Sequence, residues 1–148
     1  MTLESLNTLV GQEVTLTDWL VITQDRIEKF AEATEDRQWI HIDPERARRE
    51  SPYRATIAHG FLTLSLLSYL SRDVLHVDNI RLRVNYGLNR VRFPAPVKAG
   101  SKVRGRFLLQ AVKRIDEGAD ITLNATIEVE GSAKPCCVAE WIIRYYAT

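Results

Sequence analysis

"GFLTLSLLSYL", residues 60–70, carries apolar residues on nearly every side of a helical projection. A helix with that pattern is expected to be buried on most sides, so other elements must surround it. Thr63, Ser65 and Ser68 interrupt the run, which is far shorter than the roughly 20 residues needed to cross a bilayer. The segment therefore predicts a buried central helix rather than a transmembrane one.

The second half of the chain contains elements that can surround this helix. Four stretches are strand-like and are separated by turn-rich segments: residues 80–93, 102–115, 120–130 and 134–146. The third alternates polar residues with an apolar face made of Ile121, Leu123, Ala125, Ile127 and Val129. The last has an apolar face made of Cys137, Ala139, Trp141, Ile143 and Tyr145. Ile142 makes its opposite face partly apolar too, which hints at a partner.

The first half of the chain predicts helices. Residues 24–34 place apolar side chains on one helical face and follow Thr23, which fits an N-cap. Asp43 and Pro44 form a helix-start signal for the short charged segment that follows, and the residues between the two helices are expected to form a loop. Helices followed by a long antiparallel sheet indicate an α+β fold in which the sheet curls around the central helix.

Length and composition fit one folded domain, residues 1–148, with 45% apolar and 26% charged residues. The N-terminal residues lack the basic and apolar regions of a secretory signal, so a cytoplasmic location is expected. Cys136 and Cys137 are neighbours in a predicted strand and should point to opposite faces. They predict neither a disulfide nor a metal site.

The net charge is only +1, yet the charged residues are segregated along the chain. Residues 1–50 hold 11 of the 19 acids, whereas residues 81–114 hold 10 of the 20 lysines and arginines and no acid. This basic segment could attract a phosphate-bearing ligand; the alternative is that its cations cover the solvated outer faces of strands. Aromatic residues are not regularly interleaved with the cations, so nucleic acid is not expected as a partner.

The segment "EDRQWIHIDPERA", residues 35–47, contains a possible proton-transfer pair. Asp36 and His41 are five positions apart, which on a continuous helix would turn their side chains about 140° from each other. They can converge only if the intervening residues are not regular helix. A carboxylate beside an imidazole can orient the ring, stabilise its protonated form and help hold one water. The alternative is a solvated Asp36 at a helix end and a half-buried loop histidine.

Gly60 stands where the central helix should begin. Backbone N–H groups at a helix N-terminus lack partners, and the helix dipole favours a developing negative charge there. A glycine lets a ligand approach that backbone closely. The alternative is that Gly60 only forms a tight turn.

Three segments together resemble a known family: residues 35–47, "AHGFLTLSLLS" at 58–68 and "NYGLNRVRFPAPVKAGSKVRGR" at 85–106. They are similar to the MaoC-like, (R)-specific enoyl-CoA hydratases of the hot-dog fold, and within them to the nodulation-protein-N-like subgroup. The resemblance covers residues 14–143. It implies that the curled sheet and central helix form a hot-dog fold.

The family's hydratase motif is matched at its two ends, where its acid and histidine correspond to Asp36 and His41. Its central Asn-Pro corresponds to Gln38-Trp39. Losing the proline removes a fixed φ, and Gln38 is one methylene longer than asparagine. This departure is expected to alter the shape of the loop more than its chemistry.

On the central helix, the family's His-Gly pair corresponds to His59-Gly60, and its serine to Ser68, which the resemblance implies supports the catalytic pair. His59 is expected either to be structural or to support the catalytic residues without touching the substrate. Substrate contacts are expected from Gln38, Gly60 and Ser68, and from the strand residues Asn85, Tyr86 and Gly87, where a plain strand is the alternative.

The resemblance implies reversible syn addition of water to a trans-2-enoyl thioester, giving an (R)-3-hydroxyacyl thioester. Asp36 and His41 would hold the water, and the Gly60 N–H would meet the charge on the thioester oxygen. No metal or organic cofactor is implied. The substrate would be an acyl-CoA or an acyl carrier protein thioester, with its phosphates near the basic segment. The chain would form a homodimer with its sheets joined edge to edge, and no membrane would be involved.

Two other functions share this fold, because fold does not fix function. A thioesterase is less favoured, since thioesterases of this fold lack the Asp-to-His spacing combined with His-Gly. A non-catalytic acyl-thioester binder is favoured only by the Gln38-Trp39 departure. The sequence does not decide the acyl chain length, the carrier, the pathway, or which of Asp36 and His41 acts as the acid.

Overall fold

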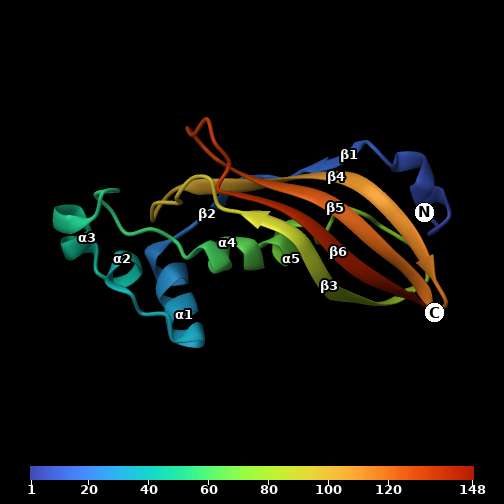
Figure 1. Cartoon of the computed structure of the whole chain (residues 1–148), viewed down its shortest axis with the longest axis horizontal. Helices are drawn as coiled ribbons and strands as arrows, with labels where there is room; N and C mark the ends of the chain where they lie inside the picture. The colour runs from blue at the N-terminus through green and yellow to red at the C-terminus, as the bar shows by residue number, and fades with distance from the viewer.

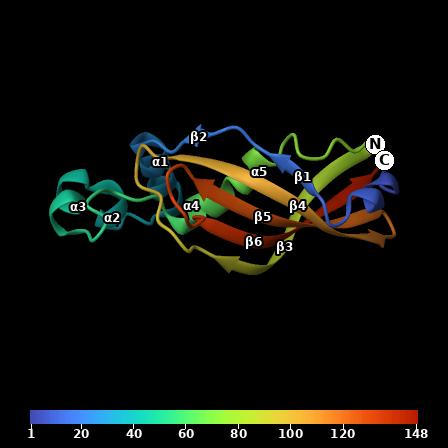
Figure 2. The same cartoon turned by 90° about the horizontal axis from the view of Figure 1, so that it is seen from above.

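An antiparallel sheet curls around one helix in the computed structural model, which describes residues 1–148 (Figures 1 and 2). Its strands are β1 (Glu13–Leu16), β2 (Leu20–Val21), β3 (Ile80–Arg92), β4 (Lys102–Ile115), β5 (Gly118–Val129) and β6 (Cys137–Ala147). Their order is β1-β4-β5-β6-β3, with β2 also paired to β4. The four long strands confirm the four predicted stretches. The short strands β1 and β2, and the 3₁₀ helix η1 (Ser5–Leu9), were not predicted.

The central helix consists of α4 (Gly60–Ser65) and α5 (Leu67–Leu70), joined through Leu66, which keeps right-handed helical backbone angles. It lies under the concave face of the sheet (Figure 1). Gly105 of β4 lets it approach closely, because a Cβ there would stand 3.3 Å from the Cβ of Leu70. The predicted apolar faces of β5 and β6 are all buried, in one core cluster that includes the helix residues, as expected for a hot-dog fold.

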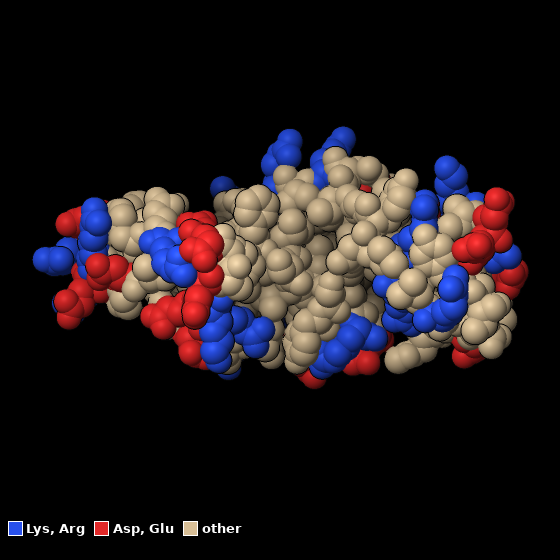
Figure 3. Space-filling model, turned by 90° about the horizontal axis from the view of Figure 1, so that it is seen from below, with Lys and Arg blue, Asp and Glu red and all other residues tan.

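One side of the central helix stays open in the single chain, so the prediction of burial on most sides was only partly right. Phe61 is 70% exposed and Tyr69 46% exposed. Tyr69 lies beside residues 15–20, whereas Ser65 and Ser68 lie beside the edge strand β3. The apolar residues Leu82, Val84, Tyr86 and Leu88 of β3 are all at least 40% exposed. Seen from below, charged side chains gather mainly toward the two ends, and a broad uncharged region lies between them (Figure 3).

Three short helices gather at one end of the sheet, next to the start of α4: α1 (Gln24–Thr34), α2 (Trp39–Ile42) and α3 (Pro44–Glu50). The predicted caps are confirmed, since Thr23 accepts a hydrogen bond from the Arg26 N–H and Asp43 accepts one from the Arg46 N–H. The one-turn helix α2 occupies part of the segment that was predicted to be a loop. None of the helices is both long and apolar enough to span a membrane.

The two cysteines are free thiols, as the sequence predicted. Both are buried, and burial raises the pKa of Cys136 to about 12 and that of Cys137 to about 11. Cys136 precedes β6, and its thiol donates to the carbonyl of Ile127. The expectation that the pair would point to opposite faces of one strand therefore does not describe Cys136, which lies outside the strand.

The charge segregation seen along the chain does not persist in space. Arg104 and Arg106 form ion pairs with Glu128 on the neighbouring strand, and Arg106 also pairs with Glu13. Arg81 and Arg114 likewise pair with acids from other segments. Cations of the basic segment without an ion pair are Arg83, Arg90, Arg92, Lys98, Lys102 and Lys113.

Candidate active site

A break after helix α1 places Asp36. The helix ends at Thr34, and Glu35 adopts a left-handed conformation with φ 63° and ψ 14°. The chain then continues without regular structure to Gln38, whose ψ is 138°, before α2 begins. Because the helix is interrupted, the 140° separation expected on a continuous helix does not apply here. The Asp36 carboxylate lies 3.4 Å from the Gln38 N–H, a weak local contact.

Asp36, His41 and His59 converge at this break. One carboxylate oxygen of Asp36 and one ring nitrogen of each histidine lie within 4.8 Å of one another. Asp36 is exposed, whereas His41 is 6% exposed and His59 only 3%. No hydrogen bond joins Asp36 directly to His41, but a single water can bridge groups at this separation. The convergence that the sequence allowed is confirmed; a catalytic role for the pair stays a prediction.

The main chain at Ile57 orients the His41 ring. The Nδ1 of His41 is 2.6 Å from the Ile57 carbonyl oxygen. A carbonyl only accepts, so Nδ1 carries the proton and Nε2 of the neutral ring is left with a free lone pair. Burial lowers the pKa of His41 below its ordinary value, although the Ile57 carbonyl opposes this shift. We expected Asp36 to orient the ring; Ile57 does so instead.

His59 contacts both members of the pair. Its Nε2 donates to the Asp36 carbonyl oxygen at 3.0 Å. Its ring stacks on that of His41, with centroids 3.7 Å apart and planes inclined by 21°. Phe30 packs against His59 at 4.9 Å between ring centroids. Of the two roles expected for His59, these contacts favour support of the pair, and that role stays a prediction.

The three converging groups do not fit a metal centre. A histidine binds a metal through a lone pair in its ring plane, at about 2.0–2.1 Å for zinc. The rings of His41 and His59 are stacked nearly parallel, so their planes meet far beyond that distance.

Gly60 begins α4, with His59 as a cap residue whose side chain makes no capping hydrogen bond. The first N–H groups of a helix have no partner within it, so the Gly60 N–H is available to a ligand. A Cβ at Gly60 would stand 3.2 Å from the Phe93 ring. Phe93 is therefore a neighbour of this N–H that sequence reasoning missed, because nothing in its local pattern connects it with Gly60.

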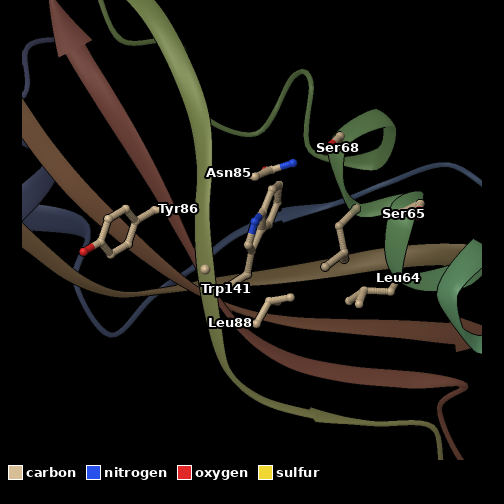
Figure 4. A pocket seen from close by; sticks show the side chains of 9 residues that line it. Leu64, Ser65, Ser68, Asn85, Tyr86, Leu88 and Trp141 are labelled. Atoms are coloured by element: carbon tan, nitrogen blue, oxygen red, sulfur yellow. The ribbon is translucent and has the colours of Figure 1, made fainter.

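The other predicted residues do not join the pair. Ser68, Asn85, Tyr86 and Gly87 line a cavity of about 310 Å³ between α4–α5 and β3 (Figure 4). The Tyr86 side chain points away from it, toward Arg144. Ser68 lies eight residues after Gly60, about 12 Å along a helix, and makes no hydrogen bond to Asp36 or His41. The expected support of the pair by Ser68 therefore involves no direct hydrogen bond, and it stays a prediction.

Gln38 caps α2 and is exposed, without a side-chain hydrogen bond to the helix. Gln24, which the sequence did not single out, has a clearer role. Its amide donates to the His41 carbonyl oxygen at 2.8 Å and accepts from the Thr56 hydroxyl at 2.5 Å. It therefore ties the main chain of His41 to the segment that precedes α4.

The chain matches a model described as a MaoC like domain over residues 5–131. It is 52% identical to 3-hydroxyacyl-thioester dehydratase Z of Mycobacterium tuberculosis over 138 residues, which are 93% of this chain and 91% of that protein. Nodulation protein N of Rhizobium leguminosarum bv. viciae is 44% identical over 146 residues, 96% of this chain and 89% of that protein. Among solved structures, an (R)-hydratase from A. caviae involved in PHA biosynthesis superposes with a TM-score of 0.74 at 24% identity, covering 91% of this chain and 95% of its own.

A sheet curled around one helix, with an acid and a histidine converging at the start of that helix, defines a hot-dog protein of the hydratase and dehydratase class. The chain belongs to the MaoC-like dehydratase family and so to a family of hydro-lyases. Within that family it is similar to nodulation protein N.

Proposed function

We propose that this protein adds water reversibly to trans-2-enoyl thioesters and forms (R)-3-hydroxyacyl thioesters. The observation that carries the proposal is the approach of the Asp36 carboxylate and the His41 imidazole to within 4.8 Å, with the free lone pair of His41 on Nε2. Two groups at that separation can share one water. The dehydratase and (R)-hydratase names of the related proteins support the reaction class.

In the proposed reaction, Asp36 and His41 hold the water through its two hydrogens. As the water oxygen bonds to C3 of the substrate, Nε2 of His41 takes one proton and the π electrons move toward C2 and the thioester carbonyl. The imidazolium then returns that proton to C2 on the same face, so the product has gained one water. The Gly60 N–H would stabilise the charge on the thioester oxygen, a contribution of about 2.7–4 kcal/mol per donor in other enzymes.

We propose that two cations without an ion pair, Arg92 and Lys98, bind the phosphates of a CoA or carrier-protein thioester. Arg92 is the last residue of β3. Lys98 follows a few residues later and pairs with Ile57, whose carbonyl contacts His41, in an isolated antiparallel β-bridge. Arg92 and Lys98 have no ion pair to an acid. Both cations thus lie near the candidate active site. Because neither is paired with an acid, each can bind a phosphate.

We also propose that the protein forms a homodimer through the edge of β3. The exposed apolar residues of that strand and the open side of the central helix support it, because such surfaces are usually covered. Light scattering after gel filtration should give twice the chain mass. Phe61→Arg should shift the protein toward the monomer, whereas Val10→Arg, another exposed apolar position, should not. A monomeric wild type would refute the dimer.

The test of the proposed reaction uses purified protein and crotonyl-CoA, with loss of absorbance of the conjugated enoyl thioester as the readout. The wild type should consume it, and Asp36→Asn and His41→Ala should each be nearly inactive while their circular dichroism stays unchanged. Chiral analysis should give the (R) product. Ligand binding without loss of absorbance would mean a non-catalytic binder, and release of free thiol would mean a thioesterase.

A further inference from the structure

His59 contacts the two members of the candidate pair in two different ways. It donates a hydrogen bond to the main-chain carbonyl of Asp36, at 3.0 Å, and its ring covers one face of the His41 imidazole, at 3.7 Å between centroids. Both contacts link segments distant in sequence, since His59 follows Asp36 by 23 positions. No other side chain in the structure touches both residues in these ways.

The segment that carries Asp36 has few other ties. Glu35 pairs with Arg37, and both side chains are substantially exposed. The Asp36 carboxylate has only its weak contact with the Gln38 N–H. The hydrogen bond from His59 is therefore the tie that connects this exposed segment to the buried helix start.

A histidine that only filled space at position 59 would be unfavourable, because its second ring nitrogen is buried without a hydrogen-bond partner. The Asp36 carbonyl can only accept, so Nε2 of His59 carries the proton and Nδ1 keeps a lone pair. That Nδ1 is buried and has no hydrogen-bond partner, which is unfavourable. A phenylalanine would fill similar space without an unpaired nitrogen. The Nε2 hydrogen bond is the contact that only the histidine offers.

We propose that His59 is a positioning residue that sets the separation between the Asp36 carboxyl group and the His41 imidazole. This inference rests on the proposed hydratase function for its catalytic consequence. His59 itself takes no proton from the substrate or the water. It fixes the Asp36 segment by its hydrogen bond and holds the ring plane of His41 by stacking, so the water meets both groups at once.

Two substitutions separate these contacts. His59→Phe keeps a stacking ring and loses the N–H donor, whereas His59→Gln keeps an N–H donor at similar reach and loses the ring. We expect His59→Phe to lower kcat for crotonyl-CoA by about 10–100-fold, by analogy with the loss seen when residues that orient metal-binding histidines are removed. KM should change less than about threefold, since His59 is only 3% exposed, and His59→Gln should recover part of kcat. His76→Phe, at an exposed histidine, is the matched control and should leave kcat unchanged.

Amide hydrogen exchange provides a readout that does not depend on activity. His59→Phe should speed exchange of the His41 N–H, which donates to the Gln38 carbonyl oxygen at 3.0 Å, by at least tenfold and leave the core of α1 protected. If the wild type hydrates no enoyl thioester, the proposed function fails, and the exchange result still decides whether His59 holds the segment. Unchanged exchange together with kcat within twofold of wild type in His59→Phe would overturn the proposal, as would a loss of kcat that merely follows the folded fraction.

Discussion

The Asp36 carboxylate and the His41 imidazole lie within 4.8 Å of each other, although a continuous helix would turn them to nearly opposite faces. The cause is local: Glu35 has a φ of 63°, so α1 ends at Thr34, two residues before Asp36. A residue other than glycine in this left-handed conformation is uncommon, and for a β-branched residue it is strained. The position of the pair therefore depends on the backbone of a residue that does no chemistry.

Substitutions at Glu35 should separate the backbone effect from the side chain. Glu35→Gly and Glu35→Val both remove the ion pair with Arg37, but only glycine adopts a positive φ without cost. We expect Glu35→Gly to keep activity within about threefold of wild type, and Glu35→Val to lose at least tenfold and to melt at a lower temperature. Equal activity in the two variants would show that the turn does not position Asp36.

The pH dependence should reflect the buried state of His41. Burial lowers the pKa of its imidazole below 6.5, the ordinary value, so the neutral form that can accept a proton persists into mildly acidic solution. We expect kcat/KM for crotonyl-CoA to fall on the acidic side with a midpoint below pH 6.5, measured in buffers of constant ionic strength. A midpoint above that value would contradict His41 as the neutral base.

The same shift predicts a change in stability. The unfolded chain binds a proton at His41 more readily than the folded chain, so this residue disfavours the folded state increasingly as the pH falls through 6.5 and down to the lower folded pKa. His41→Gln should therefore lose less free energy of unfolding than wild type between pH 7 and pH 5. Urea unfolding at the two pH values measures this difference, and parallel losses in both proteins would argue against it.

Gly60→Ala tests the helix start. The new Cβ would stand 3.2 Å from the Phe93 ring, which is 42% exposed and has room to move. We expect a small loss of stability, about 1 kcal/mol or less, and a fall in kcat of at least tenfold because the methyl group hinders approach to the N–H. Adding Phe93→Ala should restore the stability but not kcat. Recovery of kcat in the double variant would mean that crowding by Phe93, rather than access to the N–H, was the cause.

Arg92→Gln and Lys98→Gln test phosphate recognition. Each should raise KM for crotonyl-CoA several-fold at low salt, because a phosphate partner is lost, and less at high salt. KM for the pantetheine thioester of crotonate, which lacks these phosphates, should not change. Lys113→Gln removes another cation without an ion pair, near the opposite end of β4, and is the charge-matched control. An equal effect of all three substitutions would indicate only a change in overall charge.

The regular elements could be predicted from the sequence because their signals are local. Thr23 and Asp43 mark helix starts, and the alternation from Ile121 to Val129 marks a strand with one buried face. The short strands β1 and β2 lack enough residues to show a period, and their position depends on pairing with β4. Helix α2 is a single turn, too short for a periodic signal.

The site was predictable only in part. The acid, the histidine and the helix glycine follow from residue types and spacing, but the partners that hold them come from distant segments. The Ile57 carbonyl belongs to the main chain, so its contact with His41 could not be predicted from the residue type at position 57. Phe93 reaches Gly60 across 33 positions. The charge pattern misled for the same reason, since Glu128 neutralises Arg104 and Arg106 from the adjacent strand.

The carbonyl that fixes the proton on His41 belongs to a backbone that every amino acid shares. The main chain around Ile57 is held by hydrogen bonds from the Ala58 N–H to the Val97 carbonyl and from the Ala99 N–H to the Thr56 carbonyl. The side chain at position 57 can therefore change, by evolution or by design, and alter the surroundings of His41. The proton would stay on Nδ1 of His41, because the carbonyl that accepts from it remains. Insertions or deletions between Thr56 and Ala99 that break these main-chain hydrogen bonds would move the carbonyl and remove this control of the tautomer.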